Sequence, residues 1–170
     1  MAKILRVVQY PDPILRKACE PVTEFDGDLQ TLIDDMLETM YADAGMGIAA
    51  NQVAVSKRIF IMDEHSQEAP NPIIFINPEV VDQSEDEITE DEGCLSFRGL
   101  RIMVSRPRQA TIKALDRNGK EFLCEREGYA ARCMLHEYDH LQGITFFDHL
   151  SPLKRKMAEK KLQKFKRGAM

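Results

Sequence analysis

Five residues between positions 136 and 140 have the spacing of a metal-binding helix. They read His136-Glu137-Tyr138-Asp139-His140. Residues four apart lie on one face of a helix, so the two imidazoles can hold one metal ion from the same side. Glu137 follows the first histidine directly, which puts a carboxylate beside the ion, where an attacking water needs a base. The pattern predicts metal-assisted hydrolysis at a carbonyl carbon, although short motifs also arise by chance.

Two histidines are too few ligands for a catalytic site, which takes three protein ligands and keeps one position open. Cys133 lies on the same helical face, but it is about 10.5 Å along the helix from His140. Metal–ligand bonds span only about 2.0–2.3 Å, so Cys133 is predicted to be a small core residue. Cys94 is the better candidate, because Gly93 permits close backbone approach. Asp139 is predicted to orient a ligand histidine as its hydrogen-bond acceptor. The remaining cysteines and histidines are predicted to be structural or surface residues: Cys19, Cys124, His65 and His149.

A third stretch consists of small residues that end in two side-chain amides. It reads Gly45-Met46-Gly47-Ile48-Ala49-Ala50-Asn51-Gln52. No Lys-Ser or Lys-Thr follows the glycines, as a phosphate loop requires, and the position does not follow a predicted strand, as in a dinucleotide fingerprint. The stretch fits either a tight turn after a helix or a narrow backbone rail that pairs with an extended peptide. In the second case the Gln52 amide can stabilise an oxyanion.

The residues around Cys94 form a further motif, which reads Glu92-Gly93-Cys94-Leu95-Ser96. Taken together, the three motifs resemble those of the peptide deformylase family, in the family's order and at comparable spacing. The resemblance extends along nearly the whole chain and includes residues 10–16, 77–78 and 150–154. It is greatest to the bacterial form with a C-terminal helix. The resemblance implies a hydrolase that removes the formyl group from the N-terminal formyl-methionine of nascent polypeptides and releases formate.

The resemblance also implies a role for each motif residue. Glu137 would be the general base, and the Gln52 side chain and the Leu95 backbone N–H would hold the oxyanion. The implied metal ligands are Cys94, His136 and His140. The expected substrate-binding residues, inferred from their positions in and near the motifs, are Gly45, Met46, Gly47 and Ile88.

The chain departs from the family in two places. Leu135 stands where members often carry Gln, and residues 97–99 read Phe-Arg-Gly where a Pro is common. Neither departure touches a predicted ligand, so both concern the fine shape of the substrate groove.

The predicted ligand groups are compatible with several metals. Two imidazoles and one thiolate suit zinc, iron, cobalt or nickel, and zinc is the default from the residues alone. The resemblance implies one ferrous ion in the cell, so Fe²⁺ is the favoured cofactor over Zn²⁺, Ni²⁺ or Co²⁺. A thiolate together with Fe²⁺ predicts sensitivity to oxidation.

The elements that must position these residues are predicted to form an α+β fold, with mixed or antiparallel strands wrapped around the metal-binding helix. That helix is expected over residues 127–142, with Gly143 ending it. A helix over 28–43 has an apolar face, and a short helix opened by residues 11–13 ends near Cys19. Strands are predicted at 58–62, 73–76, 110–115 and 121–125, the last two as a hairpin around Asn118-Gly119. Leu95 begins a strand-like run, and the acidic segment 84–92 is predicted to be a loop or turn.

Length and composition predict one globular unit. The 170 residues are 44% hydrophobic and 30% charged, which is ordinary for a soluble domain. Residues 1–150 are expected to form the catalytic part, and residues 151–170 a basic C-terminal helix of the same unit. The absence of an apolar leader or spanning stretch and the unpatterned cysteines predict a reducing, cytoplasmic location in a bacterium. No membrane or DNA partner is expected.

The last twenty residues carry an unusual charge. Residues 151–170 contain eight Lys or Arg and one Glu, whereas the remainder contains 15 basic and 27 acidic residues. The segment fits either a solvated basic helix or a helix that docks on ribosomal RNA phosphates. The resemblance favours docking on the ribosome near the tunnel exit.

Two other functions share parts of this pattern. A metallopeptidase that cuts internal peptide bonds has the same histidine motif but usually takes an acid or a third histidine as its third ligand. A ribosome-associated protein with a structural metal would need four protein ligands. Only three can be assembled from this sequence, and Glu137 would then have no purpose.

Overall fold

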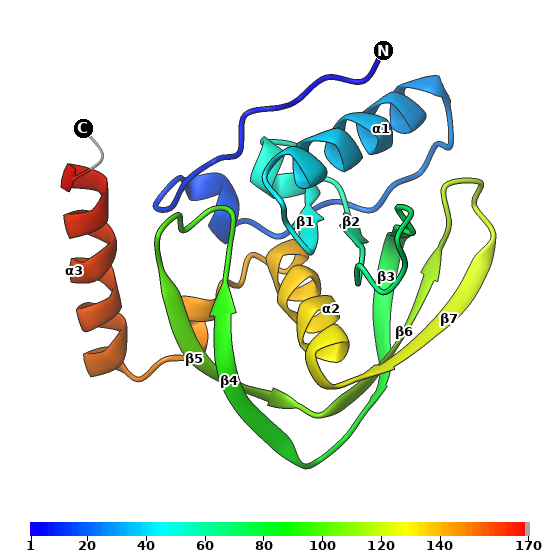
Figure 1. Cartoon of the computed structure of the whole chain (residues 1–170). Coiled ribbons are helices and arrows are strands. Elements are labelled where there is room, and N and C mark those ends of the chain that lie inside the picture. Colours follow the sequence, from blue (N-terminus) through cyan, green and yellow to red (C-terminus); the bar gives the residue numbers. More distant parts are fainter. Residues whose placement is uncertain (169–170) are drawn as a thin grey trace.

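One helix, α2 (Gly128–Leu141), lies at the centre of the molecule, and the strands curve around it (Figure 1). The computed structural model describes residues 1–168. Gly128 and Gly143, with φ of +64° and +75°, turn the chain at the two ends of the helix. The buried residues of α2 include His136, Glu137 and His140. The predicted α+β fold around a metal-binding helix is therefore confirmed.

Two antiparallel sheets surround α2 (Figure 1). The larger sheet has the strand order β1-β2-β3-β6-β7. Its strands are β1 (Gly47–Ala49), β2 (Ile59–Met62), β3 (Ile73–Gln83), β6 (Gln109–Leu115) and β7 (Glu121–Glu127). The predicted hairpin is confirmed, because β6 pairs with β7 and Gly119 in the turn has a φ of +84°. β1 comes from the small-residue stretch 45–52 and lies at the edge of this sheet.

The smaller sheet pairs β4 (Glu87–Gly93) with β5 (Arg101–Pro107). The prediction of a loop or turn over residues 84–92 is therefore wrong. Neighbouring arginines explain why this acidic segment forms a strand, since Asp91 accepts a bond from Arg101 Nε at 2.6 Å and Glu92 pairs with Arg106. The run from Leu95, expected to be strand-like, is instead a turn that directly follows Cys94.

β3 is longer than the predicted strand 73–76. It continues through Pro78, and its register with β6 shifts between Ile76 and Glu79 and again between Val80 and Asp82. A proline cannot donate to the ladder, so a strand passes it at a bulge, which also bends the strand. The bends fit the curvature of β3 around α2 (Figure 1).

The N-terminal third adds one long helix and two short turns of 3-10 helix. In α1 (Gly27–Ala42) the predicted apolar face is buried, with Leu29, Ile33, Met36 and Met40 all at 1% exposure or less. The Asp26 side chain caps this helix by accepting the Leu29 N–H at 3.0 Å. The short helix predicted to reach Cys19 is only one turn, η1 (Pro13–Arg16), because Lys17 is already extended. The second turn is η2 (Ala50–Val53).

The C-terminal segment folds back as α3 (Pro152–Gly168), beside the β4–β5 pair (Figure 1). Its inner face packs Ala158 and Leu162 against Phe97 and the aromatic residues of η3 (Phe146–His149). The basic helix predicted for residues 151–170 thus begins as expected, and its last two positions lie outside the described residues. Its membership of one unit with residues 1–150 stays a prediction.

Within residues 1–168 no helix is both long and apolar enough to cross a membrane.

Leu162→Ala should destabilise the protein, because the buried side chain leaves a cavity among aromatic rings. We expect a loss of about 2–4 kcal/mol in the free energy of unfolding, measured by urea denaturation. Leu153→Ala is the matched control, since Leu153 on the same helix is 70% exposed and should change stability by no more than about 0.5 kcal/mol. Equal stabilities of the two variants would contradict the packing of α3 onto this cluster.

Candidate active site

Three predicted ligands meet beside the central helix. His136 and His140 project from α2, and Cys94 follows the end of β4. Their ligand atoms all lie within 4.8 Å of one another, and Cys94 Sγ is 3.4 Å from His140 Nε2. Asn51 of η2 donates to the His140 carbonyl oxygen at 2.7 Å and so ties the first motif to the end of α2. The structure therefore brings the three motifs together.

The donor atoms fit a divalent transition-metal ion. His136 Nε2 is buried and has no hydrogen-bond partner in the described chain. Burial lowers the pKa of His140 well below its ordinary value, which keeps the imidazole in the neutral, metal-binding form. Burial also opposes charge on His136, but the neighbouring Cys94 and Glu92 outweigh it and raise its pKa. The same anionic surroundings favour a cation between the three ligands.

Glu92, rather than Asp139, orients the first histidine. His136 Nδ1 donates to Glu92 Oε1 at 2.8 Å, which leaves Nε2 free to bind a metal. Glu92 is itself buried and accepts from Arg132 Nη1 at 2.7 Å and Arg106 Nη2 at 3.0 Å. Asp139 instead contacts Arg106 and His149. The predicted role of Asp139 is therefore wrong, because its carboxylate faces these two side chains and not a ligand.

Glu137 lies buried beside the ligands. Its Oε1 has no hydrogen-bond partner among the described residues. Burial raises the pKa of Glu137 to about 7, against the opposing effect of His136. A Cβ atom on Gly47 would come within 2.8 Å of Glu137 Oε2, so the glycine makes room for the carboxylate. A carboxyl group with a pKa near neutrality is suited to accept a proton and return it.

The two predicted oxyanion donors lie close to Cys94. The Gln52 Oε1 atom accepts the Ala49 N–H at 2.8 Å, which turns its NH₂ group towards Ser96 Oγ at 3.1 Å and Cys94 Sγ at 3.5 Å. Leu95 accepts a bond from Gln9 Nε2 at its carbonyl oxygen, while its N–H donates no hydrogen bond within residues 1–168. Both donors thus have their positions set by neighbouring groups.

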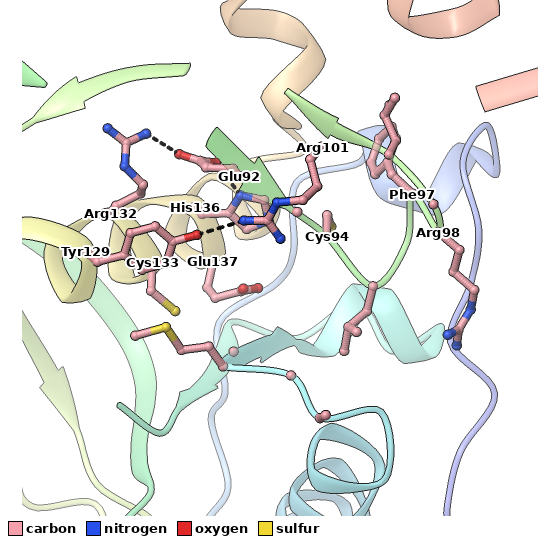
Figure 2. A pocket seen from close by; sticks show the side chains of 18 of the residues that line it. Glu92, Cys94, Phe97, Arg98, Arg101, Tyr129, Arg132, Cys133, His136 and Glu137 are labelled. Carbon is pink, nitrogen blue, oxygen red and sulfur yellow. Dashed lines mark hydrogen bonds and ion pairs between the residues drawn. The ribbon is translucent and has the colours of Figure 1, made fainter. Parts of the chain in front are cut away.

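A cavity of about 720 Å³, within the usual range for ligand pockets, is lined by Cys94, Leu95, His136 and Glu137. Gln52 and His140 are not among its lining residues. Figure 2 shows Cys133 and Glu137 on one side of it and Phe97 and Arg98 on the other. Of the predicted substrate-binding residues, Gly45, Met46 and Gly47 line the cavity. Ile88 lies on β4 and is not among the lining residues. The cysteines predicted to be structural, Cys19, Cys124 and Cys133, are buried and free, although Cys133 also lines the cavity.

Several residues of the site were not predicted. The place of Glu92 in the site could have been predicted from the sequence, because it stands two positions before Cys94 and alternate residues of a strand share a face. The sequence gives no indication that Arg106 and Arg132 belong to the site, since they reach Glu92 from β5 and α2. Phe165 of α3 lines the cavity although it is distant in sequence from all three motifs.

A buried carboxylate beside a Cys-His-His cluster, at an open cavity in an α+β frame, defines a metal-dependent hydrolase. Residues 4–156 match the family described as polypeptide deformylase, and the chain belongs to this family. It is thus a metal-dependent deformylase that removes the formyl group from nascent peptides.

Known proteins of the family are similar over nearly the whole chain. Peptide deformylase 1 of Shewanella oneidensis is 48% identical over 95% of both chains. The peptide deformylase of Thermodesulfovibrio yellowstonii is 47% identical, over 94% of this chain and 97% of its own. A crystal structure of the Legionella pneumophila enzyme has 47% identity and a TM-score of 0.91, covering 96% of both chains. The Ehrlichia chaffeensis enzyme in complex with actinonin has 39% identity and a TM-score of 0.89, over 97% and 99% of the two chains.

Glu92→Gln should weaken metal binding about 10- to 100-fold, because the amide is a poorer acceptor for His136 Nδ1. Competition with a chelator measures this affinity. Glu90→Gln is the matched control, since Glu90 lies on the same strand with its side chain exposed. Unchanged metal affinity in Glu92→Gln would show that the carboxylate does not hold the imidazole in its binding orientation.

Proposed function

We propose that Glu137 is the general base of the deformylase reaction and that three side chains hold one divalent metal ion. The proposed ligands are Cys94, His136 and His140. The observation that carries the proposal is the convergence of the three ligand atoms beside a buried carboxylate, at a cavity that Cys94, His136 and Glu137 line. The ion, when bound, would supply Lewis-acid activation of water and of the formyl carbonyl.

In this proposal the protein moves one proton and stabilises one developing charge. Glu137 takes a proton from the water that attacks the formyl carbon. Negative charge then gathers on the former carbonyl oxygen, where Gln52 Nε2 and the Leu95 N–H donate hydrogen bonds; losing one such donor typically costs about 10²–10³ in rate. As the C–N bond breaks, Glu137 returns its proton to the departing amine. The products are formate and a free N-terminal methionine.

The proposed substrate site is the cavity beside β1. This strand is at the edge of its sheet, so an extended peptide can pair with its backbone from Gly47 onward, and Gly45 just before it also lines the cavity. Met46 lines the same cavity and is proposed to contact the methionine side chain. The predicted contact of Ile88 with that side chain stays a prediction.

The proposed cofactor in the cell is Fe²⁺, which the donor set accepts and the family resemblance favours. Zn²⁺, Ni²⁺ and Co²⁺ fit the same two imidazoles and one thiolate. We also propose a cytoplasmic location. All four cysteines are free, which accords with a reducing compartment, and formylated nascent chains are made in the bacterial cytoplasm.

Glu137→Ala should lower formate release from formyl-Met-Ala-Ser by about 10²–10⁴-fold, because the attacking water loses its proton acceptor. Both proteins are purified without oxygen, and their metal content is measured, with iron expected to predominate in each. A metal-replete variant with the wild-type rate would overturn the assignment of the base. A metal-loaded wild type that releases no formate would overturn the assigned reaction.

We further propose that α3 binds the ribosome through its outer face. Leu153 and Met157 are exposed on it, and the helix also exposes a row of basic side chains. These are Lys154, Lys156, Lys160, Lys161, Lys164 and Arg167. Lysines and arginines that neutralise RNA phosphates release counterions, which makes such binding strong at low salt.

Reversing three charges by Lys160→Glu, Lys161→Glu and Lys164→Glu should weaken co-sedimentation with ribosomes roughly tenfold or more at low salt. Formate release should stay unchanged, because none of the three residues lines the cavity. The control reverses three acidic residues of α1 instead, Asp28, Asp34 and Glu38, to lysine. Undiminished binding of the α3 variant would remove the basis for the docking proposal.

A further inference from the structure

The cavity of the active site has one wall that comes from the C-terminal helix. Phe165 of α3 lines the cavity together with Arg98 and Gly99, which belong to the turn after the second motif. The Phe165 ring lies so close to Gly99 that a Cβ atom there would be 2.4 Å from it. Gly99 also has a φ of +81°, so both its backbone and its missing side chain suit this contact.

Neighbouring contacts hold the Phe165 segment in place. Lys166 donates to the Tyr10 carbonyl oxygen, and the Tyr10 hydroxyl donates to Glu159 Oε1 at 3.0 Å. The Tyr10 ring stacks on Phe97, which lines the cavity, with 4.9 Å between ring centroids. Leu162, one turn before Phe165, is buried in the same cluster as Phe97. The helix is therefore fixed to the turn that carries Leu95 and Arg98.

The position of Phe165 suits contact with a part of the substrate away from the reacting bond. Glu137 and Cys133 lie on one side of the cavity, and Phe97 and Arg98 lie on the other (Figure 2). Phe165 packs on Gly99, next to Arg98, and the residue is 46% exposed. Each further residue of an extended peptide adds about 3.3 Å, so the residues after the methionine can cross the cavity towards this ring.

We infer that Phe165 contacts an apolar side chain of the peptide after its formyl-methionine, and that α3 thereby helps to determine which nascent chains are deformylated fastest. The inference deepens the proposed function, on which it rests, because the formyl group must lie beside Glu137. Phe165 is a specificity-determining residue here and takes no part in the proton transfer.

The test compares two substrates that differ only beyond the methionine. Formyl-methionine amide ends before the proposed contact, whereas formyl-Met-Leu-Phe reaches it with two apolar residues. Phe165→Ala should lower kcat/KM for the longer peptide about 3- to 10-fold, mainly through KM, and leave the amide unaffected. Phe165→Tyr keeps the ring and should retain the wild-type ratio between the two substrates. Met157→Ala is the control on the same helix, since Met157 is 62% exposed and does not line the cavity.

Each outcome distinguishes this inference from the proposed function. A selective loss on formyl-Met-Leu-Phe in Phe165→Ala, with thermal unfolding unchanged, supports the contact. An equal loss of kcat/KM on both substrates would mean that Phe165 only supports the fold. Unchanged kcat/KM on both substrates would mean that the peptide does not reach Phe165. Either result overturns the inference. Failure of the metal-loaded wild type to hydrolyse formyl-methionine amide would instead overturn the proposed function itself.

Discussion

The buried carboxylate of Glu92 is the group on which the geometry of the active site depends. It joins Arg106 of β5 to Arg132 and His136 of α2, while it stands on β4 itself. Although burial opposes its ionisation, the bonds from His136 and Arg106 hold the pKa of Glu92 below its usual range. Removing such charges from water costs several kcal/mol per ion and is offset only when every partner is in place. The small sheet and the central helix are therefore held in one relative position, which sets the distance from Cys94 to the histidines.

The burial that opposes ionisation of Glu92 also acts on Glu137, the proposed general base. Apolar residues of α2 such as Ala131 and Met134 pack against the larger sheet and keep water away from the inner part of the helix. In that environment the Glu137 carboxyl has a pKa of about 7, and hydrogen-bond donors aimed at a developing charge act more strongly than in water. Gly47 leaves space for the Glu137 carboxylate in this densely packed region, because any side chain at position 47 would collide with it. Packing thus tunes the chemistry as well as stabilising the fold.

The C-terminal helix has one face packed against the protein and one face exposed to solvent. Its inner face is bound to the aromatic cluster around Phe97, and Phe165 at its far end reaches the cavity. Its outer face carries exposed lysines along with Leu153 and Met157. The face that packs is formed by Ala158 and Leu162.

Local pattern in the sequence was enough to determine the metal helix, its two histidines and the adjacent carboxylate, because helical periodicity alone puts residues 136, 137 and 140 beside one another. It also determined α1 and the hairpin at Gly119, where capping and turn residues act over a few positions. The tertiary structure decided what depended on distant partners. Glu92, and not Asp139, meets His136; the acidic segment forms β4 because β5 brings arginines; and Phe165 enters the cavity through the packing of α3. Except for the two-residue spacing of Glu92 and Cys94, these contacts leave no periodic pattern in the sequence, because each is set by where separate elements pack.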